Sequence, residues 1–147
     1  MIKISHRGNI DGKNPEKENK PSYILKALDL GYHCEVDVWF IDGEFKLGHD
    51  KPMYEFPYEL IKNHSNKLWL HAKDTSTFAK LYDIDSSGMY LNYFLHTTED
   101  LVLTSKNYIW AFPGKQPIER SIAVMPEYND DDISSAIGVC SDLIKNY

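Results

Sequence analysis

The sequence predicts an α/β protein built on a largely parallel β-sheet. In the first half of the chain, short strand-like runs alternate with amphipathic helical segments, a pattern typical of βα units. Each strand-like run has one small aliphatic face and one face that ends in polar groups. The length of 147 residues, with 42% hydrophobic and 26% charged residues, suits a single globular domain spanning residues 1–147.

The N-terminal half contains the clearest elements. A strand is expected at residues 2–4, and it leads directly into His6-Arg7-Gly8. A helix is expected from Pro21 to Gly31, since proline suits the first helical turn and glycine ends helices. Further expected elements are a strand over 33–40, a turn at 42–43 with a short strand after it, a weak helix over 56–63, a strand over 68–73, a helix over 75–82 and a strand over 89–94.

The C-terminal half has connections too short for full helices. Strands are expected over 108–112, 121–125 and 137–141, with a helix over 131–136. Two arrangements stay open at this point. One is a parallel barrel, and the other is an open doubly wound sheet, which would need helices on both faces.

Composition excludes several classes of partner. The net charge is −6 and the basic residues are scattered, so the chain has no footprint for nucleic acid. No apolar run approaches 18 residues and the start MIKIS is no signal peptide, which predicts a cytoplasmic protein without stable membrane insertion. The two cysteines, Cys34 and Cys140, form neither a disulfide framework nor a zinc site.

The polar strand faces are the candidate functional site. Alternation places Glu35 and Asp37 on one face of the strand over 33–40, and His71 and Lys73 on one face of the strand over 68–73. Burying such charges costs several kcal/mol unless they are paired or bound to a metal. In a parallel barrel these groups would converge on one rim, where catalytic residues of barrels lie.

Each candidate has a chemical role and a simpler alternative. Glu35 and Asp37 would repel each other, and a hard divalent cation would resolve the conflict; the alternative is two salt-bridged carboxylates. His6 and His49 could serve as general acid and base, or be ordinary histidines. Arg7 could grip a phosphate or form a rim salt bridge, and Lys73 could hold a phosphoryl oxygen or pair with the carboxylates.

Taken together, the motifs resemble those of the glycerophosphodiester phosphodiesterase family. The matching runs are H-R-G at 6–8, E-N at 18–19, E-V-D-V at 35–38 and H-D at 49–50, in this order around the expected helix. Beyond residue 50 the resemblance thins to LWLHAK at 68–73 and IGVCSD at 137–142. The family belongs to the phospholipase-C-like phosphodiesterases, which are built on a (β/α)8 barrel.

The resemblance implies metal-dependent hydrolysis of a small-molecule glycerophosphodiester to glycerol phosphate and an alcohol. It implies that His6 and His49 transfer protons. Arg7 would hold the phosphate, together with Lys73, which matches the family's lysine. Glu35 and Asp37 would bind Mg²⁺ or Ca²⁺. Glu18 matches an early acidic residue of the family's site and is counted with the metal ligands.

Two departures from the family pattern modify this expectation. His71 occupies the place of a metal-binding glutamate, and imidazole favours transition metals. We therefore consider both His71 and Glu127, expected on an inward strand face, as replacement ligands. The chain is also shorter than an ordinary barrel of about 250 residues. The resulting prediction is a pared-down (β/α) TIM-type barrel of seven or eight strands, with several helices shortened or replaced by loops, and with exposed apolar faces that could support a homo-oligomer.

Two other functions stay open. A metal-independent lyase would form a cyclic phosphodiester with the same two histidines, although Glu35 and Asp37 would then face an anionic substrate without a cation. A binding module would hold a phosphorylated ligand without turnover, which the short chain and the replaced ligand at His71 favour.

Overall fold

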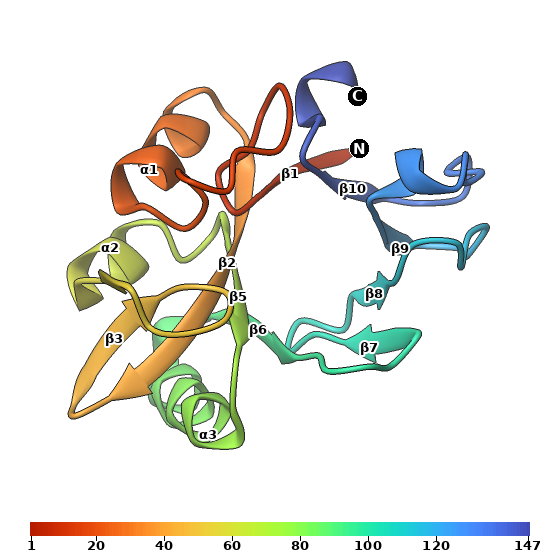
Figure 1. Ribbon diagram of the computed structural model, residues 1–147. Helices are drawn as coiled ribbons and strands as arrows, with labels where there is room; N and C mark the ends of the chain where they lie inside the picture. Colours follow the sequence, from red (N-terminus) through yellow and green to blue (C-terminus); the bar gives the residue numbers. More distant parts are fainter.

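The computed structural model describes residues 1–147 as a ten-stranded mixed sheet that curls around on itself (Figure 1). The spatial order along the curl is β6-β5-β2-β1-β10-β9-β8-β7. The strands that run parallel to their neighbours along it are β1 (Ile2–His6), β2 (His33–Ile41), β5 (Leu68–Ala72), β6 (Asn92–Leu95), β8 (Ile109–Ala111), β9 (Ser121–Val124) and β10 (Gly138–Ser141).

Three strands are antiparallel additions. Asp42 and Gly43, both with positive φ, make the tight turn that returns β2 into β3 (Glu44–Leu47). β4 (Tyr54–Glu55) pairs with β3, and β7 (Leu101–Leu103) pairs with β8. The predicted turn at residues 42–43 and the strand after it are therefore confirmed.

The helices cover only one part of the sheet. These are α1 (Pro21–Asp29), α2 (Tyr58–Asn63) and α3 (Thr75–Ile84), and Figure 1 shows all three beside β2, β3 and β5, with none over β7 to β10. Short helical turns complete the structure: η1 (Asp85–Met89), η2 (Pro126–Tyr128) and η3 (Ile144–Asn146). None of these segments is both long and apolar enough to cross a lipid bilayer.

The predicted TIM-type barrel is wrong. Such a barrel has eight alternating βα units, whereas this chain has three short helices and a mixed sheet with no strand ladder between β6 and β7. The connections after β6 do not form helices, and the one between β8 and β9 contains Pro113, Gly114 and Pro117, residues that disfavour a helix. The helix expected over 131–136 is absent, and only the turn η2 lies between β9 and β10.

The alternation of the strands is confirmed by the two main core clusters. The aliphatic faces of β2 and β5, including Val36 and Leu70, pack with α1 and α3 in the larger core. The opposite face packs Trp69, Phe94 and Trp110 inside the curl with residues of β1, β9 and β10. Side chains of β2 that share a face with Trp69 therefore point toward the inside of the curl, which is where the polar candidates lie.

Candidate functional site

The carboxyl ends of β1, β2, β5 and β10 bring the polar candidates together. The register pairs His6 of β1 with Glu35 of β2, and Asp37 of β2 with His71 of β5. In a parallel sheet, neighbouring residues in register share a face, so these side chains project inward beside one another. Residues far apart in sequence thus form one cluster because of the parallel pairing of their strands.

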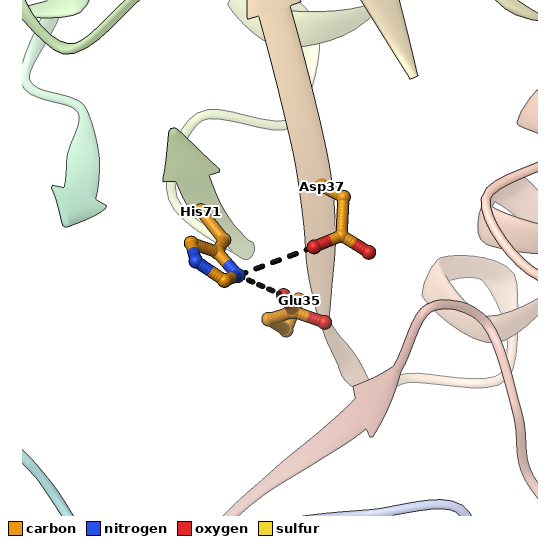
Figure 2. Close-up of side chains that lie close together, drawn as sticks. All are labelled: Glu35, Asp37 and His71. Atoms are coloured by element: carbon orange, nitrogen blue, oxygen red, sulfur yellow. Dashed lines mark ion pairs between the residues drawn. The ribbon is translucent and has the colours of Figure 1, made fainter. Parts of the chain in front are cut away.

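Glu35, Asp37 and His71 form the tightest part of this cluster (Figure 2). One potential ligand atom from each lies within 4.8 Å of the other two. His71 Nδ1 is 3.2 Å from Asp37 Oδ1 and 3.5 Å from Glu35 Oε1. Both carboxylates are buried, with exposed fractions of 2% for Glu35 and 0% for Asp37.

Two carboxylate oxygens in this cluster lack hydrogen bonds. Glu35 Oε2 and Asp37 Oδ1 are fully buried and accept none, although nitrogen atoms of His6, His71 and Lys73 lie 3.2 to 3.8 Å away. A buried polar atom without a partner costs about 1–3 kcal/mol, and more when it is charged. Both residues have suitable oxygen atoms for a divalent cation, so the donor set fits a metal ion.

Asp37 is the most heavily compensated group of the site. Asn19 Nδ2 donates to its Oδ2 at 2.9 Å, Arg7 Nε lies 2.8 Å from Oδ2, and Lys73 Nζ lies 3.2 Å from Oδ1. Burial acts to raise the pKa of Asp37, but His71, Arg7 and Lys73 outweigh burial and hold it well below its usual range. Asp37 is therefore ionised at any physiological pH.

His71 carries a proton readily in the absence of metal. Burial alone would lower the pKa of His71, but its contacts with Asp37 and Glu35 outweigh burial and raise it to about 9. A proton and a metal ion would compete for the same nitrogen.

Arg7 is held by a sharp turn directly after β1. Arg7 and Gly8 both have positive φ, and a Cβ on Gly8 would lie 2.7 Å from Tyr23 Cδ1, so glycine is required there. Arg7 Nη1 donates to Glu18 Oε2 at 3.1 Å. Burial acts to lower the pKa of Arg7, but Asp37, Glu35 and Glu18 raise it above its ordinary value. The guanidinium is therefore permanently charged.

Glu18 orients its neighbours and does not join the Glu35–Asp37–His71 group. Its Oε2 accepts from Arg7, and its Oε1 accepts from Asn9 Nδ2 at 3.0 Å. The resemblance predicted Glu18 among the metal ligands, whereas the structure gives it the role of fixing Arg7.

His6 is oriented by Asp142, which follows β10. His6 Nδ1 is 2.7 Å from Asp142 Oδ1, and Asn9 Nδ2 donates to the same oxygen at 2.7 Å. A carboxylate only accepts, so Nδ1 carries hydrogen and Nε2 is left as the atom that exchanges a proton. Burial acts to raise the pKa of Asp142, but the His6 and Asn9 contacts lower it overall.

His49 lies at the edge of the site rather than in the cluster. Its side chain is 47% exposed, and Nδ1 lies 2.7 Å from Asp50 Oδ1. The preceding Gly48 donates its N–H to the Asp37 carbonyl, and its own carbonyl accepts from Trp39 Nε1. These bonds anchor the loop that carries His49 beside β2.

The structure does not bring Glu127 to the cluster. The strand alternation expected to continue past Met125 stops there, because Met125 has a φ of 45° and the chain enters the turn η2. Glu127 instead accepts hydrogen bonds from Ser141 Oγ at 2.6 Å and from the Tyr147 hydroxyl at 3.0 Å. Its side chain is used in packing the C-terminal segment.

Three residues of the site were missing from the predicted set. Asp142 bonds to His6, and Asn9 donates to the same Asp142 oxygen. Asn19 makes two hydrogen bonds with Asp37: its Nδ2 donates to the carboxylate, and its Oδ1 accepts from the Asp37 backbone N–H at 3.0 Å. Asp142 shares the parity of Cys140 at the end of the last strand, and this could have marked it as inward-facing.

Comparison of the chain with protein-family models, with curated proteins and with solved structures gives no match. The functional conclusion therefore depends on the chemistry of the cluster. A buried pair of carboxylates with free oxygens, an oriented histidine and two fixed cations suit the binding of a metal ion and an anionic group side by side.

Proposed function

We propose that this protein is a metal-dependent phosphodiesterase that hydrolyses a glycerophosphodiester to glycerol phosphate and an alcohol. The observation that carries the proposal is the pair of buried, unbonded oxygens on Glu35 and Asp37, placed beside Arg7 and His6. The sequence resemblance over residues 4–50 names the substrate class. The cation that the resemblance implies is Mg²⁺ or Ca²⁺, and Glu35 and Asp37 would be its carboxylate ligands.

Arg7 and Lys73 provide the positive charge that an anionic phosphodiester requires. Arg7 donates one hydrogen bond, from Nη1 to Glu18, and forms an ion pair with Asp37 through Nε, so N–H groups of its two terminal nitrogens stay available for phosphoryl oxygens. Lys73 is fixed by Asp37 at the same edge. A bound divalent cation supplies Lewis-acid stabilisation of charge on the phosphoryl group.

His6 and His49 are the proton-transfer groups of the proposal. Asp142 holds the His6 ring so that Nε2 takes a proton from the attacking nucleophile or gives one to the leaving alcohol. His49, exposed on its anchored loop, takes the complementary role. Acid–base catalysis by two histidines needs one ring protonated, as the acid, and the other neutral, as the base.

The test is phosphorus NMR on purified protein with a panel of glycerophosphodiesters, with and without Mg²⁺. The expected result is a glycerol phosphate signal that disappears with chelator and with His6→Ala, and that persists in His64→Gln, a control at the end of α2. A cyclic phosphate product would replace the hydrolase with the lyase alternative. If no diester is cleaved, the proposed phosphodiesterase activity is refuted.

A binding module is the second candidate, because His49 is exposed and bonded to Asp50 rather than to the cluster. It predicts that glycerol phosphate binds, with an affinity that depends on Arg7, while no diester is cleaved. We further propose that the protein acts in the cytoplasm, a reducing compartment that suits the buried free thiols of Cys34 and Cys140.

A further inference from the structure

We infer that His71 binds the metal ion through Nδ1, and that this nitrogen makes the site prefer a first-row transition ion such as Mn²⁺ over Mg²⁺ and Ca²⁺. The inference rests on the cation site of the proposed function and specifies which class of ion occupies it.

The first observation is the fixed orientation of the His71 ring. The ring stacks on Phe94 of β6, with centroids 5.0 Å apart and planes 11° from parallel, and its side chain is only 12% exposed. β6 and β5 are hydrogen-bonded neighbours in which His71 and Phe94 are in register. The ring is therefore held in one plane by the sheet itself, as a preorganised ligand must be.

The second observation is the hydrogen bond that fixes the tautomer. His71 Nε2 lies 3.0 Å from the backbone carbonyl oxygen of His96. A carbonyl only accepts, so Nε2 carries the hydrogen. In the neutral ring the lone pair is then on Nδ1, the atom that faces Asp37 and Glu35. Metal-binding histidines in proteins use this arrangement, donating the other ring N–H to a backbone carbonyl or carboxylate.

The third observation is what Nδ1 faces. Asp37 Oδ1 and Glu35 Oε1 lie 3.2 Å and 3.5 Å away, and Oδ1 accepts no hydrogen bond. With His71 neutral, the Nδ1 lone pair and the two carboxylate oxygens repel one another unless a cation lies among them, either the proton that Nδ1 takes up without metal or a metal ion that displaces it. Two carboxylate oxygens and one imidazole nitrogen then form the donor set, with room in the coordination shell for substrate or water.

This donor set discriminates between ions. Mg²⁺ and Ca²⁺ are hard ions that take oxygen ligands, whereas first-row transition ions also accept imidazole, with affinities that rise from Mn²⁺ through Fe²⁺ along the Irving–Williams order. A site made of carboxylates alone suits Mg²⁺, Ca²⁺ and Mn²⁺ alike. His71 is therefore the residue that sets ion selectivity.

The test uses metal-free protein and Mn²⁺ alone, so that it needs no substrate. Pulsed electron paramagnetic resonance of the Mn²⁺-loaded protein should show modulation from a directly bound ¹⁴N nucleus. The modulation should vanish in His71→Glu and persist in the control His64→Gln. In calorimetric titration, the parent should bind Mn²⁺ at least ~10-fold more tightly than Mg²⁺. In His71→Glu, this ratio of Mn²⁺ to Mg²⁺ affinity should fall by ~10-fold or more.

Two results would overturn the inference: Mn²⁺ bound without ¹⁴N modulation in the parent, or equal affinities for Mn²⁺ and Mg²⁺. Absence of the signal in the parent overturns the inference even if His71→Glu does not fold, and because His6 Nε2 lies 3.8 Å from Glu35 Oε2, a signal that persists in His71→Gln would also overturn it. The proposed function can fail separately. If Mn²⁺ is bound by ¹⁴N but no phosphodiester is cleaved, the metal-binding role of His71 stands and the proposed hydrolase activity is refuted.

Discussion

The metal-free protein should lose stability between neutral and alkaline pH because of one histidine. The folded pKa of His71 is about 9, against an ordinary value of 6.5, because Asp37 and Glu35 stabilise its charged form. A group whose pKa is raised by folding stabilises fully below its unfolded pKa, and that stabilisation is lost as pH rises through the folded pKa. The window is therefore about pH 6.5 to 9.

The size of the effect follows from the same two values. One pKa unit is about 1.4 kcal/mol, so the gap between 6.5 and about 9 corresponds to about 3 kcal/mol of unfolding free energy. Little discount for solvent applies, since the side chain is only 12% exposed. Asp37 adds nothing in this window, because its pKa lies well below the usual carboxyl range.

Urea unfolding in the presence of chelator, followed by tryptophan fluorescence at pH 6 and pH 9, measures this difference. The parent should lose about 3 kcal/mol more than His71→Gln between the two pH values. Other groups titrate in both proteins and cancel in the comparison. Saturating Mn²⁺ should reduce the difference, since the metal replaces the proton. If the parent and the variant lose the same free energy, His71 is not the charged partner of the two carboxylates.

Three further perturbations test separate parts of the site. Asp142→Ala should lower kcat for diester hydrolysis by ~10-fold or more with a small change in KM, because His6 loses the group that fixes its ring; a kcat equal to that of the parent would exclude this role. Gly8→Ala should reduce the unfolding free energy by about 1–3 kcal/mol in urea titrations, because a Cβ there lies 2.7 Å from Tyr23 at a φ of 92°; unchanged stability would mean that the turn relaxes freely. Removing bound metal with chelator at pH 7.5 should lower the Tm in calorimetry, and a Tm independent of metal would exclude binding to the folded state.

Local sequence patterns correctly predicted which residues share a face of a strand. They did not predict that the sheet fails to close into a barrel. The alternation in residues 33–40 places Glu35 and Asp37 on the opposite face from Val36, and the structure shows this directly. Alternation depends only on the two-residue repeat of a strand. Which strands meet depends on long-range pairing, and no local pattern indicated that the ladder stops between β6 and β7.

The same distinction explains the predicted and the missed site residues. His6 and Asp142 are 136 residues apart and meet because Ile4 pairs in register with Cys140. Sequence reasoning about single motifs cannot supply this pairing. Glu127 shows the opposite error, since a parity argument was carried past the point at which β9 ends and the backbone turns.

The two carboxylates of the site should differ in their effect on stability while sharing a role in metal binding. Asp37 contacts Arg7, Lys73 and Asn19. Removing its charge with Asp37→Asn leaves Lys73 without its anionic partner and takes one of two from Arg7, which keeps Glu18, and this should cost about 3–5 kcal/mol.

Glu35 is equally buried, but the nitrogen atoms nearest its carboxylate belong to His71 at 3.5 Å and His6 at 3.8 Å, and its Oε2 accepts no hydrogen bond. Replacing a whole buried ion pair by apolar residues is often neutral or stabilising by about 1–4 kcal/mol, whereas removing one charged partner is destabilising. Above pH 9 His71 has lost its charge, so Glu35 no longer has this charged partner. In chelator above pH 9, Glu35→Met should therefore unfold at the same urea concentration as the parent or a higher one, while Asp37→Asn unfolds at a lower one. Both variants should lose Mn²⁺ binding. Equal destabilisation by the two substitutions would mean that Glu35 is retained as part of a structural ion-pair network, and the reason for placing a cation beside it would disappear.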